Sequence, residues 1–84
     1  MTDREIITLI DTTLVNEFEL NSDEMSPKAS LKDDLGLDSL DRVDMVVVLE
    51  KAFGFKMGEE EAIKAIRTLG DIHAFVIARS KQIA

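Results

Sequence analysis

Ser39 is the residue of this chain best placed for covalent chemistry, because it carries a hydroxyl at the predicted start of a helix. Asp38 comes directly before it as a good N-cap, and Asp41 follows three residues after Asp38. Free backbone N–H groups and the helix dipole favour a phosphate attached at such a place. A serine there can also serve only as a helix-capping residue. The position therefore permits modification of Ser39 without requiring it.

Other reactive side chains are sparse. The chain has no Cys, so it has no disulfide and no thiolate metal site, and its single histidine, His73, lies far from Ser39 in the sequence. A Ser-His-Asp triad is therefore not expected. Asp33 and Asp34 suggest a calcium site only weakly, because the surrounding oxygen ligands do not follow EF-hand spacing. We expect no catalytic residue and no metal ligand.

The helix that follows Asp38 has two apolar faces when its residues are placed about 100° apart. The face assigned to the core holds Met45, Leu49, Ala52 and Phe53. The other face holds Ser39, Val43, Val46, Val47 and Glu50, with Leu40 and Asp44 on its flanks and Val46 at the boundary. An apolar strip bordered by charge is typical of a docking surface. The alternative is a helix buried on several sides.

Helical spacing and capping patterns predict an all-α fold that positions this helix. The first helix starts at Thr2, where Glu5 completes a capping box, and fades between Phe18 and Leu20. A long connection over residues 19–37 leads to the Ser39 helix, which stops at Gly54. A short third helix runs from Glu59 to Ile66, and the last helix begins at Thr68 with Asp71 in a second capping-box pattern. The buried residues of the last helix are expected to be Leu69, Ile72, Val76 and Ile83, with Phe75 and Ile77 beside them.

Composition limits the class of partner. The 84 residues suit one small domain, 45% hydrophobic but only 5% aromatic, which favours a core of aliphatic side chains. The net charge is −7, with −10 on residues 1–61 and +3 on residues 62–84. Basic protein surfaces fit this charge, whereas nucleic acid and anionic membrane do not. A long apolar run and a signal-peptide pattern are both absent from the sequence, so we expect a cytoplasmic protein without membrane insertion.

Two segments resemble those of acyl carrier proteins. The first is Asp33-Asp34-Leu35-Gly36-Leu37-Asp38-Ser39-Leu40-Asp41, which is similar to the family's phosphopantetheine attachment segment, and the second is Thr68-Leu69-Gly70-Asp71-Ile72. The resemblance extends to about Ile77 and implies one carrier domain over residues 1–84, folded as a four-helix bundle with a short third helix. It implies that a phosphopantetheinyl transferase moves 4′-phosphopantetheine from coenzyme A to Ser39, with help from Asp38. The chain would then be a carrier rather than an enzyme.

The resemblance also implies the cargo and the docking residues. Acyl groups would travel as thioesters on the arm between enzymes of fatty acid, lipid or polyketide-type synthesis. Basic patches on those enzymes would meet a docking surface made of Leu40, Asp41, Val43, Asp44, Val47 and Glu50. The carrier is expected to be a monomer, and a small apolar cavity in the bundle could shelter the acyl chain.

Three residues depart from the family pattern and suggest a specialised, free-standing member. Arg42 is expected to bury its stem toward the core, with its head in water or paired with Asp38 or another acid. Phe55 is expected to close one end of the core, and His73 to be partly exposed or at the core edge. Two alternatives stay open: a peptidyl, aryl or D-alanyl carrier with the same mechanism, and an unmodified helical adaptor.

Overall fold

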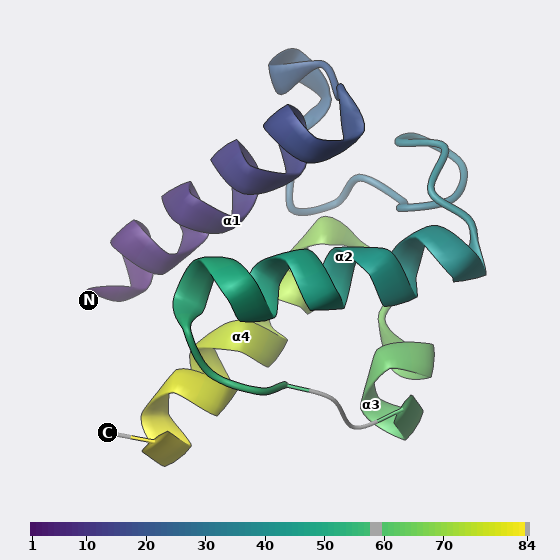
Figure 1. Cartoon of the computed structure of the whole chain (residues 1–84). Helices are drawn as coiled ribbons and strands as arrows, with labels where there is room; N and C mark the ends of the chain where they lie inside the picture. The colour runs from purple at the N-terminus through teal and green to yellow at the C-terminus, as the bar shows by residue number, and fades with distance from the viewer. Residues whose placement is uncertain (58–59, 84) are drawn as a thin grey trace.

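The structure is a computed structural model that describes the backbone of residues 1–57 and 60–83 and the side chains of residues 1–57 and 63–81. Its helices are α1 (Asp3–Phe18), α2 (Ser39–Phe53), α3 (Glu60–Ala65) and α4 (Leu69–Ile83), with a single 3-10 turn, η1 (Ser22–Glu24), between α1 and α2 (Figure 1). Within the described residues there is no strand beyond one isolated bridge. The predicted all-α bundle, its short third helix and its long connection are confirmed. None of the described helices is both long and apolar enough to cross a membrane.

The ends of α1 and α4 follow their capping sequences. The Thr2 hydroxyl accepts the Glu5 amide at 3.2 Å, and the Glu5 carboxylate accepts the Thr2 amide at 2.8 Å, so the predicted capping box is present. Hydrogen bonding of the Glu5 carboxylate by Thr2, through its backbone N–H first and its side chain second, lowers the pKa of Glu5. Thr68 and Asp71 make the equivalent pair at the start of α4, with 3.1 Å and 3.2 Å hydrogen bonds. Both helix starts were therefore readable from the sequence.

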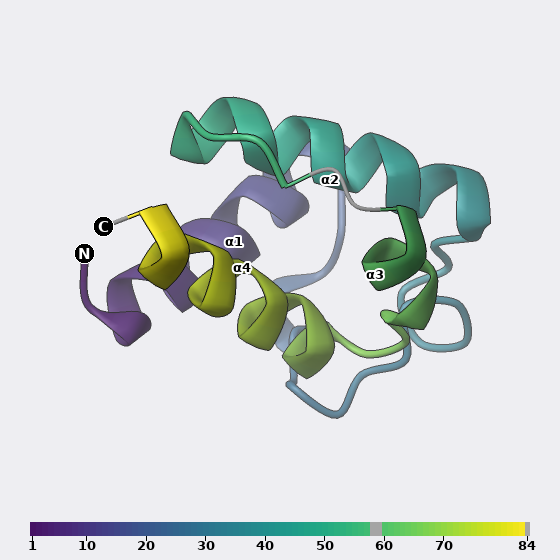
Figure 2. The ribbon, with the colours of Figure 1, turned by 90° about the horizontal axis from the view of Figure 1, so that it is seen from below.

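The helices enclose an aliphatic core. α1 packs against both α2 and α4, whereas α3 packs against α2 near its N-terminal end (Figures 1 and 2). The start of α1 and the end of α4 lie together at the other end of the bundle. Side chains buried to less than 2% exposure fill the centre: Ile10, Leu14, Leu31, Met45, Leu49, Met57, Leu69, Ile72 and Val76.

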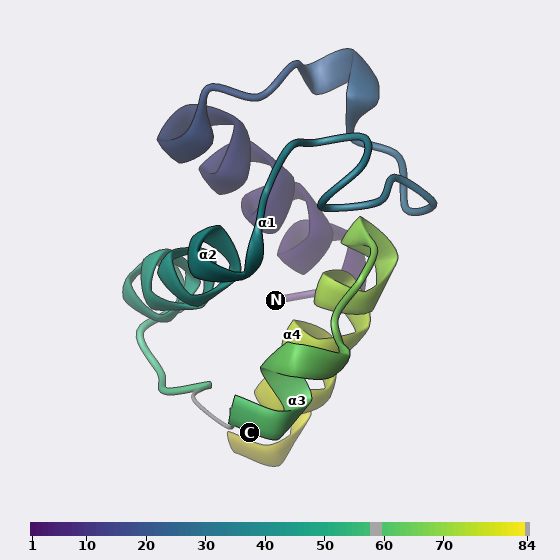
Figure 3. The same cartoon turned by 90° about the vertical axis from the view of Figure 1, so that its right-hand side faces the viewer.

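The long connection is held against the segment between α3 and α4, and it wraps one end of the bundle (Figure 3). The Leu31 amide donates to the Arg67 carbonyl at 2.9 Å, and the Leu69 amide donates to the Ala29 carbonyl at 3.0 Å. The Gly70 amide donates to the Pro27 carbonyl at 2.8 Å, and a Cβ at Gly70 would lie 2.9 Å from that oxygen. The close approach of the two segments therefore requires a glycine at position 70.

Burial corrects several assignments from the sequence. Met45 and Leu49 are buried as predicted, and Val46 joins them at 4% exposure, so the boundary residue belongs to the core. Ala52, which the helical wheel placed on the core face, is exposed, and it lines a surface hollow between α1 and α2. The prediction for Ile83 falls on a side chain outside the described set.

Phe55 and His73 were both predicted to lie at the limits of the core. Phe55 is half-buried against the core and packs edge-to-face on Phe53, with ring centroids 5.9 Å apart, which fits the predicted role at the end of the core. His73 was expected at the core edge or partly exposed, and the second of these was wrong. It is buried, and its Nε2 lies 2.7 Å from Asp11 Oδ1, because the carboxylate of α1 gives the imidazole of α4 a partner inside the bundle.

Candidate functional site

The Asp38 carboxylate begins α2 and leaves the Ser39 hydroxyl outside the cap. Asp38 Oδ1 accepts the amides of Leu40 and Asp41, each at 3.0 Å, and Asp41 Oδ2 accepts the Asp38 amide at 3.2 Å. Ser39 is the first residue of α2 and is exposed, and within the described chain its hydroxyl forms no hydrogen bond. Asp38, and not Ser39, therefore caps α2, and the serine hydroxyl is accessible.

No imidazole of the described chain is placed to activate that hydroxyl. The chain's single histidine, His73, is buried in α4 and bonded to Asp11 of α1. Oδ1 of the neighbouring Asp38 carboxylate accepts two backbone amides. Within the described chain, the geometry thus gives the hydroxyl no Ser-His pair of the kind that activates a nucleophile.

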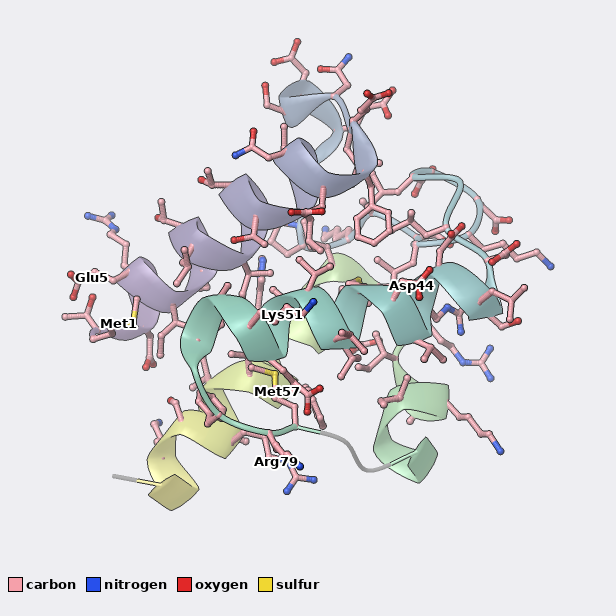
Figure 4. All side chains as sticks on the ribbon, in the orientation of Figure 1. Met1, Glu5, Asp44, Lys51, Met57 and Arg79 are labelled. Atoms are coloured by element: carbon pink, nitrogen blue, oxygen red, sulfur yellow. The ribbon has the colours of Figure 1, made fainter. Side chains whose placement is uncertain are left out.

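An exposed apolar strip runs along α2 from this serine. It consists of Leu40, Val43 and Val47, whose exposed fractions are 75%, 51% and 43%. Asp44 is exposed beside the strip and lies nearer the start of α2, whereas Lys51 lies nearer the helix end (Figure 4). The structure thus brings together the apolar residues that the sequence assigned to one face, with an acid at their edge.

The two other acidic residues predicted for docking have structural partners. Asp41 is half-buried in the cap, as described above. Glu50 is half-buried, and its Oε2 accepts the Met57 amide at 2.7 Å. Figure 4 shows Met57 on the chain that leaves α2 and passes beneath it. Glu50 therefore fixes the path toward α3, and its docking role stays a prediction.

A cleft of about 360 Å³ opens beside Ser39, between α2 and α3. We call it the Ser39 cleft, and it is lined by Ser39, Leu40, Arg42, Val43, Ile63 and Lys64. Its walls combine apolar side chains with two cations, although the first two-thirds of the chain is strongly acidic. Sequence reasoning missed the cleft. The i, i+3 spacing of Ser39 and Arg42 was a usable signal, but Ile63 and Lys64 are joined to them only by the tertiary fold.

Arg42 lines the Ser39 cleft, and the burial of its stem toward the core stays a prediction. The residue is half-buried, and its Nε atom is buried without a hydrogen-bond partner. Within the described side chains Arg42 forms no ion pair, so the alternative pairing with Asp38 or another acid is not observed.

The acidic turn before α2 is occupied by backbone contacts. Asp34 Oδ2 accepts the Ser30 amide at 2.7 Å, and Ser30 Oγ accepts the Asp33 amide at 3.2 Å. No group of three or more His, Asp or Glu side chains in the described chain is arranged to hold a metal ion. The calcium alternative therefore gains no support from the geometry.

Comparison with known families decides what kind of site this is. Residues 8–76 match the model of the phosphopantetheine attachment site family. The chain belongs to this family. Phosphopantetheine attachment domains bear a covalent 4′-phosphopantetheine group and are acted on by a phosphopantetheinyl transferase and by partner enzymes. This establishes a phosphopantetheine carrier, while the cargo is a separate question.

The residues of this attachment domain fit the group. An accessible hydroxyl stands at the mouth of a cleft that has room beside it, and two cationic side chains in that cleft suit the negative charge of a phosphodiester. When bound, the group supplies a terminal thiol on which cargo is held as a thioester. The chain's own residues position its point of attachment.

Proposed function

We propose that Ser39 is the attachment residue and that the protein carries acyl groups to partner enzymes of lipid or polyketide-type synthesis. The observation that supports this most directly is the exposed, unbonded Ser39 hydroxyl at the start of α2, in the segment that resembles the attachment sequence. Asp38 holds the first turn rigid by accepting two amides, so a modifying enzyme meets a preformed helix end.

Intact mass after incubation with coenzyme A and a phosphopantetheinyl transferase tests the attachment. We expect one adduct on the wild-type chain and none on Ser39→Ala. Ser22→Ala is a matched control, because Ser22 is also exposed and also begins a helix, η1, behind a capping side chain, Asn21. An adduct that persists in Ser39→Ala, or none on the folded wild type, contradicts the proposal. The second result favours the unmodified adaptor.

The docking proposal uses the exposed apolar strip and the acid beside it. Leu40, Val43 and Val47 present apolar area without cover from the described chain, and Asp44 adds negative charge that steers basic surfaces toward it. We expect Val47→Ser to weaken binding to an acyl-processing enzyme at all salt concentrations, whereas Asp44→Asn weakens it mainly at low salt. Unchanged affinity in both variants would remove α2 from the proposed docking surface.

The cargo is proposed to be acyl because the cleft walls contributed by Leu40, Val43 and Ile63 are aliphatic. Peptidyl, aryl and D-alanyl carriers are the alternatives. The thioester released from protein isolated from its source identifies the cargo by mass. Loading a medium-length acyl group should also shift the resonances of Val43 and Ile63, and unchanged shifts would exclude shelter of the chain by this cleft.

A further inference from the structure

Within the described residues, the Nε–H of Arg42 has no hydrogen-bond acceptor. Its Nε atom is buried and makes no hydrogen bond, and the described side chains offer it no ion pair. A charged group that is partly withdrawn from water without a partner is costly, and burial of an unsatisfied donor adds to that cost. Arg42 therefore brings to the wall of the Ser39 cleft a guanidinium whose Nε–H has no acceptor among the described residues.

A second cation faces the same space from another helix. Lys64 of α3 and Arg42 of α2 both line the Ser39 cleft, and Lys64 likewise forms no ion pair with a described side chain. The nearest acids along α2, Asp38 and Asp41, accept backbone amides and form no ion pair with either cation in the described chain. Two cations without an ion pair to any described side chain thus line the cleft beside one accessible hydroxyl.

We propose that Arg42 and Lys64 form an anion site for the phosphodiester that joins the prosthetic arm to Ser39. This inference rests on the proposed attachment at Ser39. A guanidinium donates paired hydrogen bonds to phosphate oxygens, and an ammonium adds a compact positive charge. Arg42 lies three residues after Ser39, and therefore on the same side of α2 as the bonded oxygen.

The consequence is directional. A phosphodiester held by Arg42 and Lys64 starts the arm across the Ser39 cleft toward α3, and away from Val47, the one residue of the exposed apolar strip that does not line the cleft. The positive side chains in an otherwise acidic segment then serve the arm rather than a protein partner.

Exchange of the Arg42 Nε–H proton, measured by NMR before and after modification, tests the proposal. Intact mass first establishes whether the adduct is on Ser39. We expect exchange at least about tenfold slower in the modified protein, the factor that a charge-assisted hydrogen bond in a partly desolvated site supplies. Unchanged exchange with the adduct in place overturns the anion site while leaving the proposed function intact. Absence of an adduct on Ser39 overturns both.

The rise in melting temperature on modification provides a second readout. We expect a rise in the wild type that is lost in Arg42→Gln and reduced in Lys64→Gln. Lys51→Gln is the control, because this exposed lysine also lies on α2 but does not line the cleft. If Arg42→Gln fails to fold, exchange at Nε in the wild type and the melting shift in Lys64→Gln still decide the question. An equal rise in all variants contradicts the proposal.

Discussion

The buried contact between His73 and Asp11 makes a sharp prediction about what links α4 to α1. The His73 side chain is 8% exposed and the Asp11 side chain 27%, with 2.7 Å between Nε2 and Oδ1. Asp11→Ala removes the carboxylate and leaves a buried ring nitrogen without that partner. An unsatisfied buried polar group costs about 1–3 kcal/mol, and replacing Asp by Ala inside a helix returns about 0.5 kcal/mol.

We therefore expect Asp11→Ala to lower the free energy of unfolding by about 1–2 kcal/mol. Each kcal/mol corresponds to a fall of about 4–8 °C in Tm for a domain of this size. His73→Leu should change the result. An apolar side chain in the same place needs no partner, and the partly exposed Asp11 can be hydrated instead. In that background Asp11→Ala should cost less than about 0.5 kcal/mol or be stabilising.

The double-mutant cycle measured by urea unfolding isolates the contact. The expected coupling free energy is at least about 0.5 kcal/mol. Asp44→Ala serves as a control, because it makes the same change at an exposed position in a helix and should stay within about 0.5 kcal/mol of the wild type. Equal effects of Asp11→Ala in the two backgrounds would refute the view that the carboxylate satisfies the imidazole.

Three further predictions concern the contacts that frame the site. Gly70→Ala should lower the free energy of unfolding by about 1–3 kcal/mol, because the new methyl lies 2.9 Å from the Pro27 carbonyl; urea unfolding measures it. Glu50→Ala should speed exchange of the Met57 amide, which loses its 2.7 Å partner, whereas Lys51→Ala should not. Donation from the Arg67 backbone N–H is the largest cause that lowers the pKa of the Asp71 carboxyl below its ordinary value of 3.8. The ionised Asp71 therefore stabilises the folded protein fully above that pH, and this stabilisation is lost as the pH falls through the lower pKa of the folded state. Asp71→Asn should reduce the loss of unfolding free energy between about pH 6 and about pH 3, and an unchanged loss contradicts this.

Local patterns carried most of the correct structural predictions. Thr2 with Glu5, Asp38 with Asp41, and Thr68 with Asp71 satisfy helix ends within four residues, so the sequence contains all the partners involved. The third helix was also placed closely, although its predicted first residue, Glu59, lies outside the described residues and Ile66 follows the helix end.

Contacts between distant segments were not readable. Ala52 has the spacing of a core residue, but it is exposed beside α1, and His73 is buried with Asp11 of another helix as its partner. Glu50 looks like a surface acid until Met57 returns beneath α2. The accessible Ser39 was suggested by its resemblance to an attachment segment, whereas the cleft beside it needs α3 in place. Spacing along one helix says nothing about such partners.

The two helices that form the walls of the Ser39 cleft, α2 and α3, are stabilised by different contacts. α2 is capped at its start by Asp38 and ends at Gly54 in the left-handed conformation, and it packs on α1. α3 has six residues, far fewer than the roughly 12–15 that an isolated helix needs to be even marginally stable in water. It depends on neighbouring contacts such as Glu50 with the Met57 amide and Leu31 with the Arg67 carbonyl.

An anion held between Arg42 and Lys64 therefore links α2, the stable helix, to α3, the marginally stable one. The free energy gained by that bridge raises the cost of opening whichever element opens most easily, and this is α3. Amide exchange after modification should consequently slow most in residues 60–65 and little in α2, even though the bond to the arm is on α2. Slowing confined to α2 would mean that the phosphodiester contacts Arg42 without reaching Lys64.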